Sequence, residues 1–164
     1  MNYKEKLKHI STFIFDVDGV LTDGKIILMP DGEQLRNMNV KDGMAIRTAI
    51  EKGFRVGIIS GGKGKGLEQR FKYLNITDVY LGSSDKVDSL SDLMHVHDLE
   101  FENILYVGDD INDWEVMKTV GLACCPQDAV PEIKNIADYI SHKNGGNGCV
   151  REIIEQTLKA QNKW

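Results

Sequence analysis

The sequence predicts an α/β protein of three layers, in which helices cover both faces of a mostly parallel sheet. Short apolar segments alternate along the whole chain with segments whose apolar residues recur at helical spacing. The apolar segments stop at glycine or at acidic residues, as strands buried on both faces of a sheet often do. With 164 residues, 41% of them hydrophobic, the chain is expected to form one domain, 1–164, around a single sizeable core.

The first strand is expected at Thr12–Phe15, an apolar run that ends abruptly at two acidic residues, Asp16 and Asp18. If the extended conformation continues through Val17, these two carboxylates point to the same side. A Pro-Asp-Gly turn at 30–32 then separates two short segments, which predicts a β-hairpin insert over about 24–40. A two-stranded hairpin has little core of its own, so we expect it to project and to gain from burial.

Beyond the hairpin, helices and strands alternate along the rest of the chain. Apolar residues at helical spacing, followed by Lys52 and Gly53, predict a helix from Gly43 to Lys52. Further strands are expected at 54–59, 79–81, 104–107, 121–125 and 139–140. Further helices are expected at 67–74, from Lys86 through Met94, at 114–120, at 133–137 and at 150–160. The glycine cluster at 145–148 is expected to form a mobile loop before the last helix.

The charge balance excludes several classes of partner. Lysine and arginine number 20 against 25 aspartate and glutamate residues, a formal net charge of −5. We therefore expect neither nucleic acid nor membrane as a partner, because the chain lacks the positive field that attracts them. The first residues contain no apolar signal core, and no apolar run approaches a membrane span. Cys124, Cys125 and Cys149 have no metal-binding spacing, which indicates reduced, buried thiols in a cytoplasmic protein.

Polar side chains follow the carboxyl ends of the expected strands. Ligands of parallel sheets bind beyond these ends, so the side chains are expected to form one site. They are Asp16 and Asp18 after the first strand, Ser60 after the second, Lys86 just beyond the third, and Asp109 and Asp113 after the fourth.

Each of these residues also has a plainer interpretation. Aspartate beside glycine is common in turns, and Ser60 before Gly61 is compatible with a turn alone. A lysine that opens a helix, as Lys86 does, is usually exposed. Asp109, Asp110 and Asp113 suit the cap and first turn of a helix. Only their joint position at one edge of the sheet favours a functional site.

Carboxylates, a hydroxyl and an ammonium group in one place suit phosphoryl transfer. Asp16 and Asp109 offer the oxygen ligands that Mg²⁺ prefers, and the metal would reduce the repulsion between an anionic nucleophile and a phosphate. Asp16 then suits attack on phosphorus, and Asp18 suits proton transfer to the leaving group and from the attacking water. Ser60 and Lys86 would hold the remaining phosphate oxygens.

Four segments, taken together and in order, resemble the motifs of the haloacid dehalogenase superfamily of phosphatases. They are Asp16-Val17-Asp18-Gly19-Val20-Leu21-Thr22-Asp23, Ser60-Gly61, Lys86 and Gly108-Asp109-Asp110-Ile111-Asn112-Asp113. The resemblance covers nearly the whole chain and implies a Rossmann-like fold and a Mg²⁺ cofactor. It implies Asp16 as nucleophile and metal ligand, and Asp18 as acid/base whose backbone carbonyl also contacts the metal. It further implies Asp109 as metal ligand, Ser60, Gly61 and Lys86 as phosphate binders, and Asp110 and Asp113 as supporting carboxylates.

Other segments resemble the capless branch of that superfamily that includes 3-deoxy-D-manno-octulosonate 8-phosphate (KDO 8-phosphate) phosphatase. They are Val40-Lys41-Asp42-Gly43 and the tail Gly145-Gly146-Asn147-Gly148-Cys149-Val150-Arg151-Glu152. The resemblance implies a phosphorylated 2-keto-3-deoxy sugar acid as substrate, a role in lipopolysaccharide biosynthesis, and a homotetramer assembled through the hairpins. A nonulosonate 9-phosphate is the alternative substrate.

The segment after Ser60 departs from the pattern of that branch. Gly-Arg is usual there, whereas this chain has Gly61-Gly62-Lys63. Lys63 or Lys65 supplies positive charge but not the two-pronged hydrogen bonding of a guanidinium. The resemblance also places Arg151 near substrate, although an ion pair with Glu155 one turn later explains it equally well.

The spacing leaves no room for a cap domain, because hairpin, helix and strand already fill the interval from Asp18 to Ser60. We therefore expect a neighbouring subunit to cover the site. A phospho-acceptor signalling domain also combines an acidic cluster, a hydroxyl and a lysine, but its acceptor follows a later strand. A non-catalytic assembly domain is the remaining alternative, and the intact set of motifs argues against it.

Overall fold

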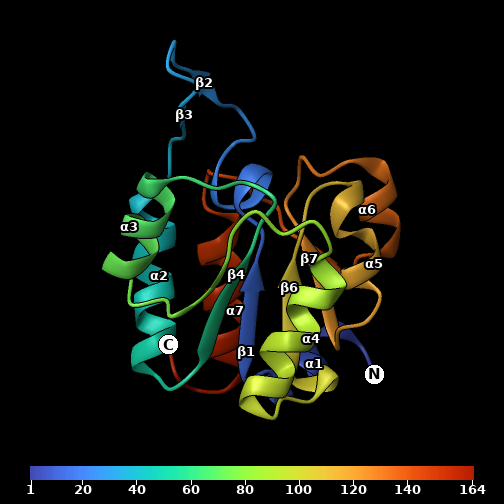
Figure 1. Ribbon diagram of the computed structural model, residues 1–164. Coiled ribbons are helices and arrows are strands. Elements are labelled where there is room, and N and C mark those ends of the chain that lie inside the picture. Colours follow the sequence, from blue (N-terminus) through green and yellow to red (C-terminus); the bar gives the residue numbers. More distant parts are fainter.

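A computed structural model describes residues 1–164 and contains a six-stranded sheet in which every pair of neighbouring strands is parallel (Figure 1). The order across the sheet is β5-β4-β1-β6-β7-β8, so β1 lies in the middle between β4 and β6. The strands are β1 (Thr12–Phe15), β4 (Arg55–Ile59), β5 (Asp78–Tyr80), β6 (Ile104–Val107), β7 (Leu122–Cys125) and β8 (Tyr139–Ile140). The prediction of a largely parallel α/β sheet is confirmed.

Helices cover both faces of the sheet and form two separate apolar cores, which completes the expected three layers (Figure 1). One core contains Phe13 and Phe15 of β1, and the other contains Ile14, because successive side chains of a strand face opposite sides. The first face is covered by α2 (Val40–Glu51), α3 (Lys65–Tyr73) and α7 (Cys149–Ala160). The second face is covered by α4 (Lys86–His97), α5 (Trp114–Met117) and α6 (Pro131–Ile136).

The chain contains one short α-helix that the sequence pattern missed. This helix, α1 (Tyr3–Lys6), has no apolar stripe, and Asn2 and Glu5 stabilise it by a reciprocal capping box. The helix α2 also begins earlier than expected, because the side chain of Asn39 accepts a hydrogen bond from the backbone N–H of Lys41 and caps the first turn at Val40.

The helices α2 and α7 pack against each other at their N-terminal ends. Asp42 of α2 is buried, and its carboxylate accepts a hydrogen bond of 2.9 Å from the backbone N–H of Arg151 in the first turn of α7. A carboxylate at this position compensates N–H groups that a helix leaves without partners. The Val40-Lys41-Asp42-Gly43 segment and the tail therefore meet in space.

The loop before α7 is firmly held, contrary to the expectation of a mobile loop. The backbone N–H of Gly146 donates to the carbonyl of Val20, and that of Gly145 donates to the carboxylate of Asp128. The backbone at Gly145 lies so close to the carbonyl of Gly19 that no side chain would fit. These glycines permit close approach to the segment after β1.

The hairpin projects from the edge of the sheet where the strands end, as the blue segment at the top of Figure 1 shows. Its strands β2 (Ile27–Leu28) and β3 (Gln34–Leu35) pair antiparallel with each other and with no other strand. The large apolar side chains on the hairpin strands are exposed.

No helix of the chain combines the length and apolar character of a membrane span. Cys124, Cys125 and Cys149 are free and buried, as predicted.

Candidate active site

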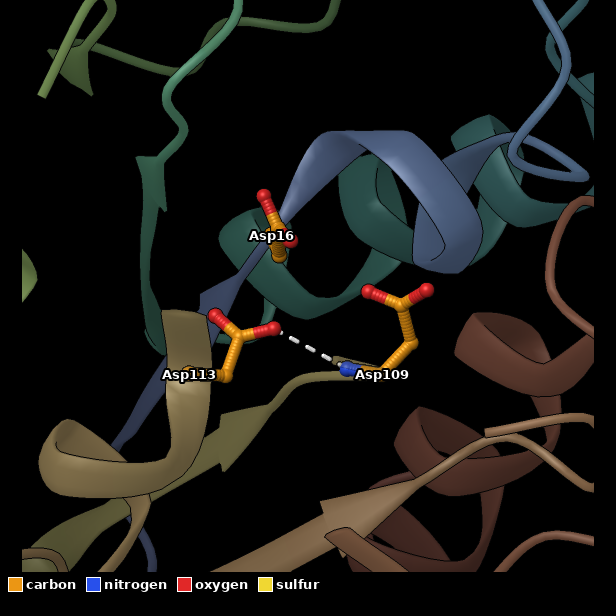
Figure 2. A group of neighbouring side chains, drawn as sticks. All are labelled: Asp16, Asp109 and Asp113. Atoms are coloured by element: carbon orange, nitrogen blue, oxygen red, sulfur yellow. Dashed lines mark hydrogen bonds between the residues drawn. The ribbon is translucent and has the colours of Figure 1, made fainter. Parts of the chain in front are cut away.

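Three carboxylates meet where β1 and β6 end (Figure 2). Asp16 directly follows β1, Asp109 follows β6 by two residues, and Asp113 lies in the helical turn Ile111–Asp113 that comes next. One oxygen of each carboxylate lies within 4.8 Å of the others. The structure thus places two of the three expected metal ligands together, with Asp113 beside them.

Asp113 holds its neighbours in this group in place by hydrogen bonds. Its side chain is fully buried, and one oxygen accepts hydrogen bonds of 2.7 Å from both Lys86 Nζ and the hydroxyl of Tyr106. The other oxygen accepts a 3.0 Å hydrogen bond from the backbone N–H of Asp109 (Figure 2). Asp113 therefore fixes both the ammonium group of Lys86 and the segment that carries Asp109.

Lys86 lies between Asp113 and Asp16, with Nζ 2.7 Å from the first carboxylate and 3.1 Å from the second. Burial lowers the pKa of Lys86, but the attraction of Asp113 and Asp16 outweighs burial, so that its pKa is raised overall. The ammonium group therefore stays charged. It is not the exposed lysine that its position at the start of a helix would normally indicate.

The carboxylates themselves carry more negative charge than this one lysine compensates. Burial, reinforced by the charge of Asp113, raises the pKa of Asp16 well above its ordinary value. Burial and the charges of Asp113 and Asp110 raise the pKa of Asp109 to about 7. A divalent cation among these oxygens would remove the mutual repulsion of the carboxylates.

The donor set fits Mg²⁺, a hard cation that takes oxygen ligands. Both oxygens of Asp113 are already engaged with protein donors, so Asp16 and Asp109 are the residues available to bind it. Gly19 has a φ of +84°, and a Cβ there would overlap the carboxylate of Asp109. Glycine at position 19 is therefore needed both for the turn after β1 and for the approach of Asp109.

Ser60 and Gly61 complete a small cavity of about 300 Å³ above the carboxylates. Ser60 is buried directly after β4, and its hydroxyl accepts a 3.1 Å hydrogen bond from the backbone N–H of Gly62. Asp110 is exposed and caps the turn at Ile111 with its own carboxylate, so it lies at the rim. The cavity is lined by Asp16, Asp18, Gly24, Ser60, Gly61, Gly62, Asp109, Asp110 and Asn112.

Asp18 is held differently from the prediction. The strand β1 ends at Phe15, and the segment Val17–Leu21 is kinked, with extended dihedrals at Asp18 and a positive φ at Gly19, although Asp16 and Asp18 both line the small cavity. The carboxylate of Asp18 pairs with Arg36 of the hairpin, with 2.7 Å between Oδ1 and Nε. The condition that the strand continues through Val17 is therefore not met, although the two aspartates still line the same cavity.

Two residues of the site carried no recognisable signal in the sequence. Tyr106 lies within the apolar run of β6, where nothing distinguishes its hydroxyl from a core position. Arg36 is a single arginine in a hairpin strand, and its contact with Asp18 depends on how the hairpin tilts toward the sheet.

The three residues predicted to contact substrate, Lys63, Lys65 and Arg151, lie in two different places. Lys63 and Lys65 line a second cavity of about 890 Å³ between the hairpin and α3. Arg151 does not line either cavity, because its Nε lies 3.8 Å from Glu155 and its guanidinium stacks 5.5 Å from the ring centre of Trp164. Within one chain, Arg151 thus adopts the ion pair of the plainer interpretation.

Comparison with known proteins gives matches over nearly the whole chain. A family profile described as haloacid dehalogenase-like hydrolase matches residues 75–153. The 3-deoxy-D-manno-octulosonate 8-phosphate phosphatases KdsC of Salmonella typhi and of Escherichia coli K12 are each 44% identical over 158 residues, covering 96% of this chain and 84% of the relative.

Solved structures resemble the chain equally closely. The 3-deoxy-D-manno-octulosonate 8-phosphate phosphatase of Yersinia pestis has a TM-score of 0.95 and 40% identity, with 98% of this chain and 86% of that chain covered. The Moraxella catarrhalis phosphatase in complex with magnesium ion, phosphate ion and KDO has a TM-score of 0.93 and 34% identity, with 97% and 91% covered.

Proposed function

Since this chain belongs to the 3-deoxy-D-manno-octulosonate 8-phosphate phosphatase family of haloacid dehalogenase-like hydrolases, we propose that it is a Mg²⁺-dependent phosphatase that hydrolyses KDO 8-phosphate to KDO and inorganic phosphate. The observation that carries the proposal is the meeting of Asp16, Asp109 and Lys86 beneath one small cavity at the carboxyl end of the sheet. This cavity suits a phosphoryl group, and the larger cavity beside it suits the sugar acid.

Asp16 and Asp18 divide the chemistry between them. A carboxylate oxygen of Asp16 attacks phosphorus, the bond from phosphorus to the sugar oxygen breaks, and Asp18 gives a proton to that oxygen. Asp18 then takes a proton from a water molecule, whose oxygen attacks the phosphorus of the aspartyl phosphate. Inorganic phosphate leaves, and the Asp16 carboxylate is restored.

The surrounding residues hold the reacting groups in position. Ser60, Gly61 and Gly62 line the cavity, where Ser60 Oγ and the backbone N–H of Gly61 suit the phosphate oxygens, while the N–H of Gly62 donates to Ser60 Oγ. Lys86, charged and in contact with Asp16, stabilises negative charge on the nucleophile side. When bound, Mg²⁺ held by Asp16 and Asp109 supplies the charge that offsets repulsion between carboxylate and phosphate.

Phosphate release from a panel of sugar phosphates tests the proposal most directly. The panel contains KDO 8-phosphate, a nonulosonate 9-phosphate and neutral sugar phosphates, each with Mg²⁺ and with chelator. We expect metal-dependent release, fastest from KDO 8-phosphate, and a loss of at least about 10³-fold in Asp16→Asn because the nucleophile is removed. Undiminished turnover by Asp16→Asn would exclude it as nucleophile, and faster release from the nine-carbon acid would replace the proposed substrate.

We further propose that the enzyme is a cytoplasmic homotetramer in which neighbouring hairpins cover the active sites. The hairpin projects at the edge of the sheet where the strands end, exposes several large apolar side chains and lines the larger cavity beside the catalytic one. The exposed apolar side chains of the hairpin are Ile26, Ile27, Leu28, Met29 and Leu35.

The three cysteines of the chain are free and buried, which suits a reducing compartment such as the cytoplasm.

A variant with a shortened hairpin tests the assembly. Light scattering is expected to show a smaller particle than the full chain, and phosphate release is expected to fall because the sites lose their cover. A shortened variant that kept both its subunit number and its activity would contradict this assignment.

A further inference from the structure

The side chain of Arg36 folds back from the hairpin onto the catalytic edge. The hairpin is largely exposed, but the side chain of Arg36 is only 6% exposed. Its Nε lies 2.7 Å from Oδ1 of Asp18, and its Nη2 lies 3.2 Å from Oδ2. This is the two-pronged arrangement in which a guanidinium binds a carboxylate most strongly.

Gly62 provides the space for this guanidinium. A Cβ atom at position 62 would lie 2.8 Å from Nη2 of Arg36 and 3.2 Å from Oδ2 of Asp18. The backbone of Gly62 is not in the left-handed region, so a larger residue here would meet the Arg36 guanidinium but no conformational strain. The guanidinium from the hairpin thus occupies the volume that any side chain at position 62 would need.

The Asp18–Arg36 pair stands at the boundary between two cavities. Asp18 lines the small cavity with Asp16 and Ser60, and Arg36 lines the larger one. Gly61 and Gly62 line both cavities, which shows that they are adjacent. The basic residues of the larger cavity are Arg36, Lys63, Lys65 and Arg70, against the single acidic residue Glu33. The larger cavity is therefore suited to an anionic group, separate from the phosphate.

The pair with Arg36 also keeps Asp18, the proposed proton carrier, from transferring protons. While both oxygens of Asp18 accept hydrogen bonds from Arg36, neither is free to exchange a proton with a leaving group beside Asp16. Another carboxylate on the same guanidinium would replace Asp18 with little change in interaction energy, because the two-pronged geometry is the same.

We propose that Arg36 is a specificity-determining residue that couples recognition of a substrate carboxylate to the release of Asp18. The inference rests on the proposed phosphatase function. The carboxylate of the sugar acid takes over the guanidinium of Arg36, and Asp18 then turns to the leaving oxygen. A sugar phosphate whose sugar has no carboxylate cannot displace Asp18 from Arg36, so Asp18 stays paired. Binding energy from a remote part of the substrate is thereby converted into a higher kcat.

The coupling is tested by the ratio of two kcat values. The first is for KDO 8-phosphate, and the second is for mannose 6-phosphate, whose sugar has no carboxylate. In Arg36→Gln we expect this ratio to fall at least about tenfold, through a higher kcat on mannose 6-phosphate, because Asp18 is no longer held by the guanidinium whichever substrate is bound. Arg36→Lys keeps the charge but not the fork, so it is expected to restore only part of the ratio. Lys25→Gln removes a positive charge from an exposed position of the same hairpin and is expected to leave the ratio unchanged.

Calorimetric binding of KDO itself provides a readout that needs no turnover. We expect at least about fivefold weaker binding to Arg36→Gln than to the unmodified enzyme or to Lys25→Gln, because a charge-assisted fork is lost. An unchanged ratio in a folded Arg36→Gln, or an equal fall on both substrates, would overturn the role of Arg36 alone. Failure of the unmodified enzyme to release phosphate from any sugar acid would instead overturn the proposed function, while KDO binding would still decide between the Arg36 variants.

Discussion

Asp16 and Asp18 are separated by one residue, and each pairs with one cation, but the two pairs lie in different kinds of surroundings. Lys86, the partner of Asp16, comes from a helix packed on the sheet, and both side chains are 5% exposed. Arg36, the partner of Asp18, comes from a two-stranded hairpin, and the side chain of Asp18 is 37% exposed. The first pair belongs to the rigid body of the protein, and the second belongs to an element that has little core of its own.

This difference assigns different tasks to the two halves of the site. A buried pair keeps its geometry because either charge alone would be strongly destabilised, which suits the positioning of a nucleophile and a metal. A pair open to solvent on one side exchanges partners at little energetic penalty, which suits a group that must respond to the substrate. In the proposed mechanism, the nucleophile side of the site is thus preformed, and the leaving-group side is adjustable.

The largest effect is expected from breaking the buried pair. Lys86→Met leaves Asp16 and Asp113 without their cation and should lower the free energy of unfolding by about 3–5 kcal/mol. Activity should fall at least about 10²-fold, because the charge beside the nucleophile is gone. Urea denaturation measures the first effect, and phosphate release measures the second.

Arg36→Gln is the matched comparison, because it breaks the half-exposed pair. We expect it to lower the free energy of unfolding by about 1 kcal/mol or less.

The double variant Lys86→Met with Asp113→Asn should recover part of the stability lost by Lys86→Met, since one unpaired charge is removed with the cation. Equal losses in Lys86→Met and Arg36→Gln would contradict the division into a buried and an adjustable half.

The next effect concerns metal binding and pH. Burial and the neighbouring carboxylates raise the pKa of Asp109 to about 7, from about 4 in an unfolded chain. The folded protein therefore binds this proton more tightly, so its contribution to stability is present below about pH 4 and is lost as the pH rises to about 7. Mg²⁺ competes with protons for the same oxygens, so its stabilisation should be larger at pH 8 than at pH 5.

Thermal unfolding with Mg²⁺ and with chelator measures this difference. At a hundredfold excess over its Kd, Mg²⁺ should contribute about 2.7 kcal/mol at pH 8, or roughly 5–10 °C for a chain of this size. Asp109→Asn should lose most of this shift, and Arg36→Gln should keep it, because Arg36 is not among the metal-binding residues. A shift of equal size at both pH values would argue against Asp109 as the ligand.

The sequence predicted the rigid half of the site far better than the adjustable half. Buried parallel strands have near-continuous apolar runs, and their direction places the residues that follow them at one edge, so the meeting of Asp16, Ser60 and Asp109 could be expected. Tyr106 could not be identified, because its hydroxyl bonds to Asp113 from within such an apolar run.

The adjustable half depends on tertiary geometry that no local pattern records. The chain kinks at Asp18 and Gly19 directly after β1, and the side chain of Arg36 reaches Asp18 from the hairpin. Gly62 illustrates the difference most clearly. In the sequence it marks a position where an arginine is missing, and in the structure it is the space that an arginine from elsewhere occupies.

The smallest effect is expected from filling that space. In Gly62→Ala the new methyl group would lie 2.8 Å from Nη2 of Arg36, the end of a flexible side chain, so the guanidinium should shift by a few tenths of an ångström. Stability should change by no more than about 0.5 kcal/mol. The preference for the sugar-acid phosphate should fall about threefold, less than in Arg36→Gln, because the fork is displaced and not removed.

Combining the two substitutions shows whether Gly62 acts through Arg36. If the methyl group matters only because it displaces the guanidinium, it has nothing to displace once Arg36 is glutamine. The double variant should then show the same substrate preference as Arg36→Gln alone, a clear departure from independent effects. A Cβ atom at position 62 would also lie 3.4 Å from the hydroxyl oxygen of Ser60. An additional threefold loss of this substrate preference in the double variant would therefore point to Ser60. It would assign Gly62 to the phosphate side of the site.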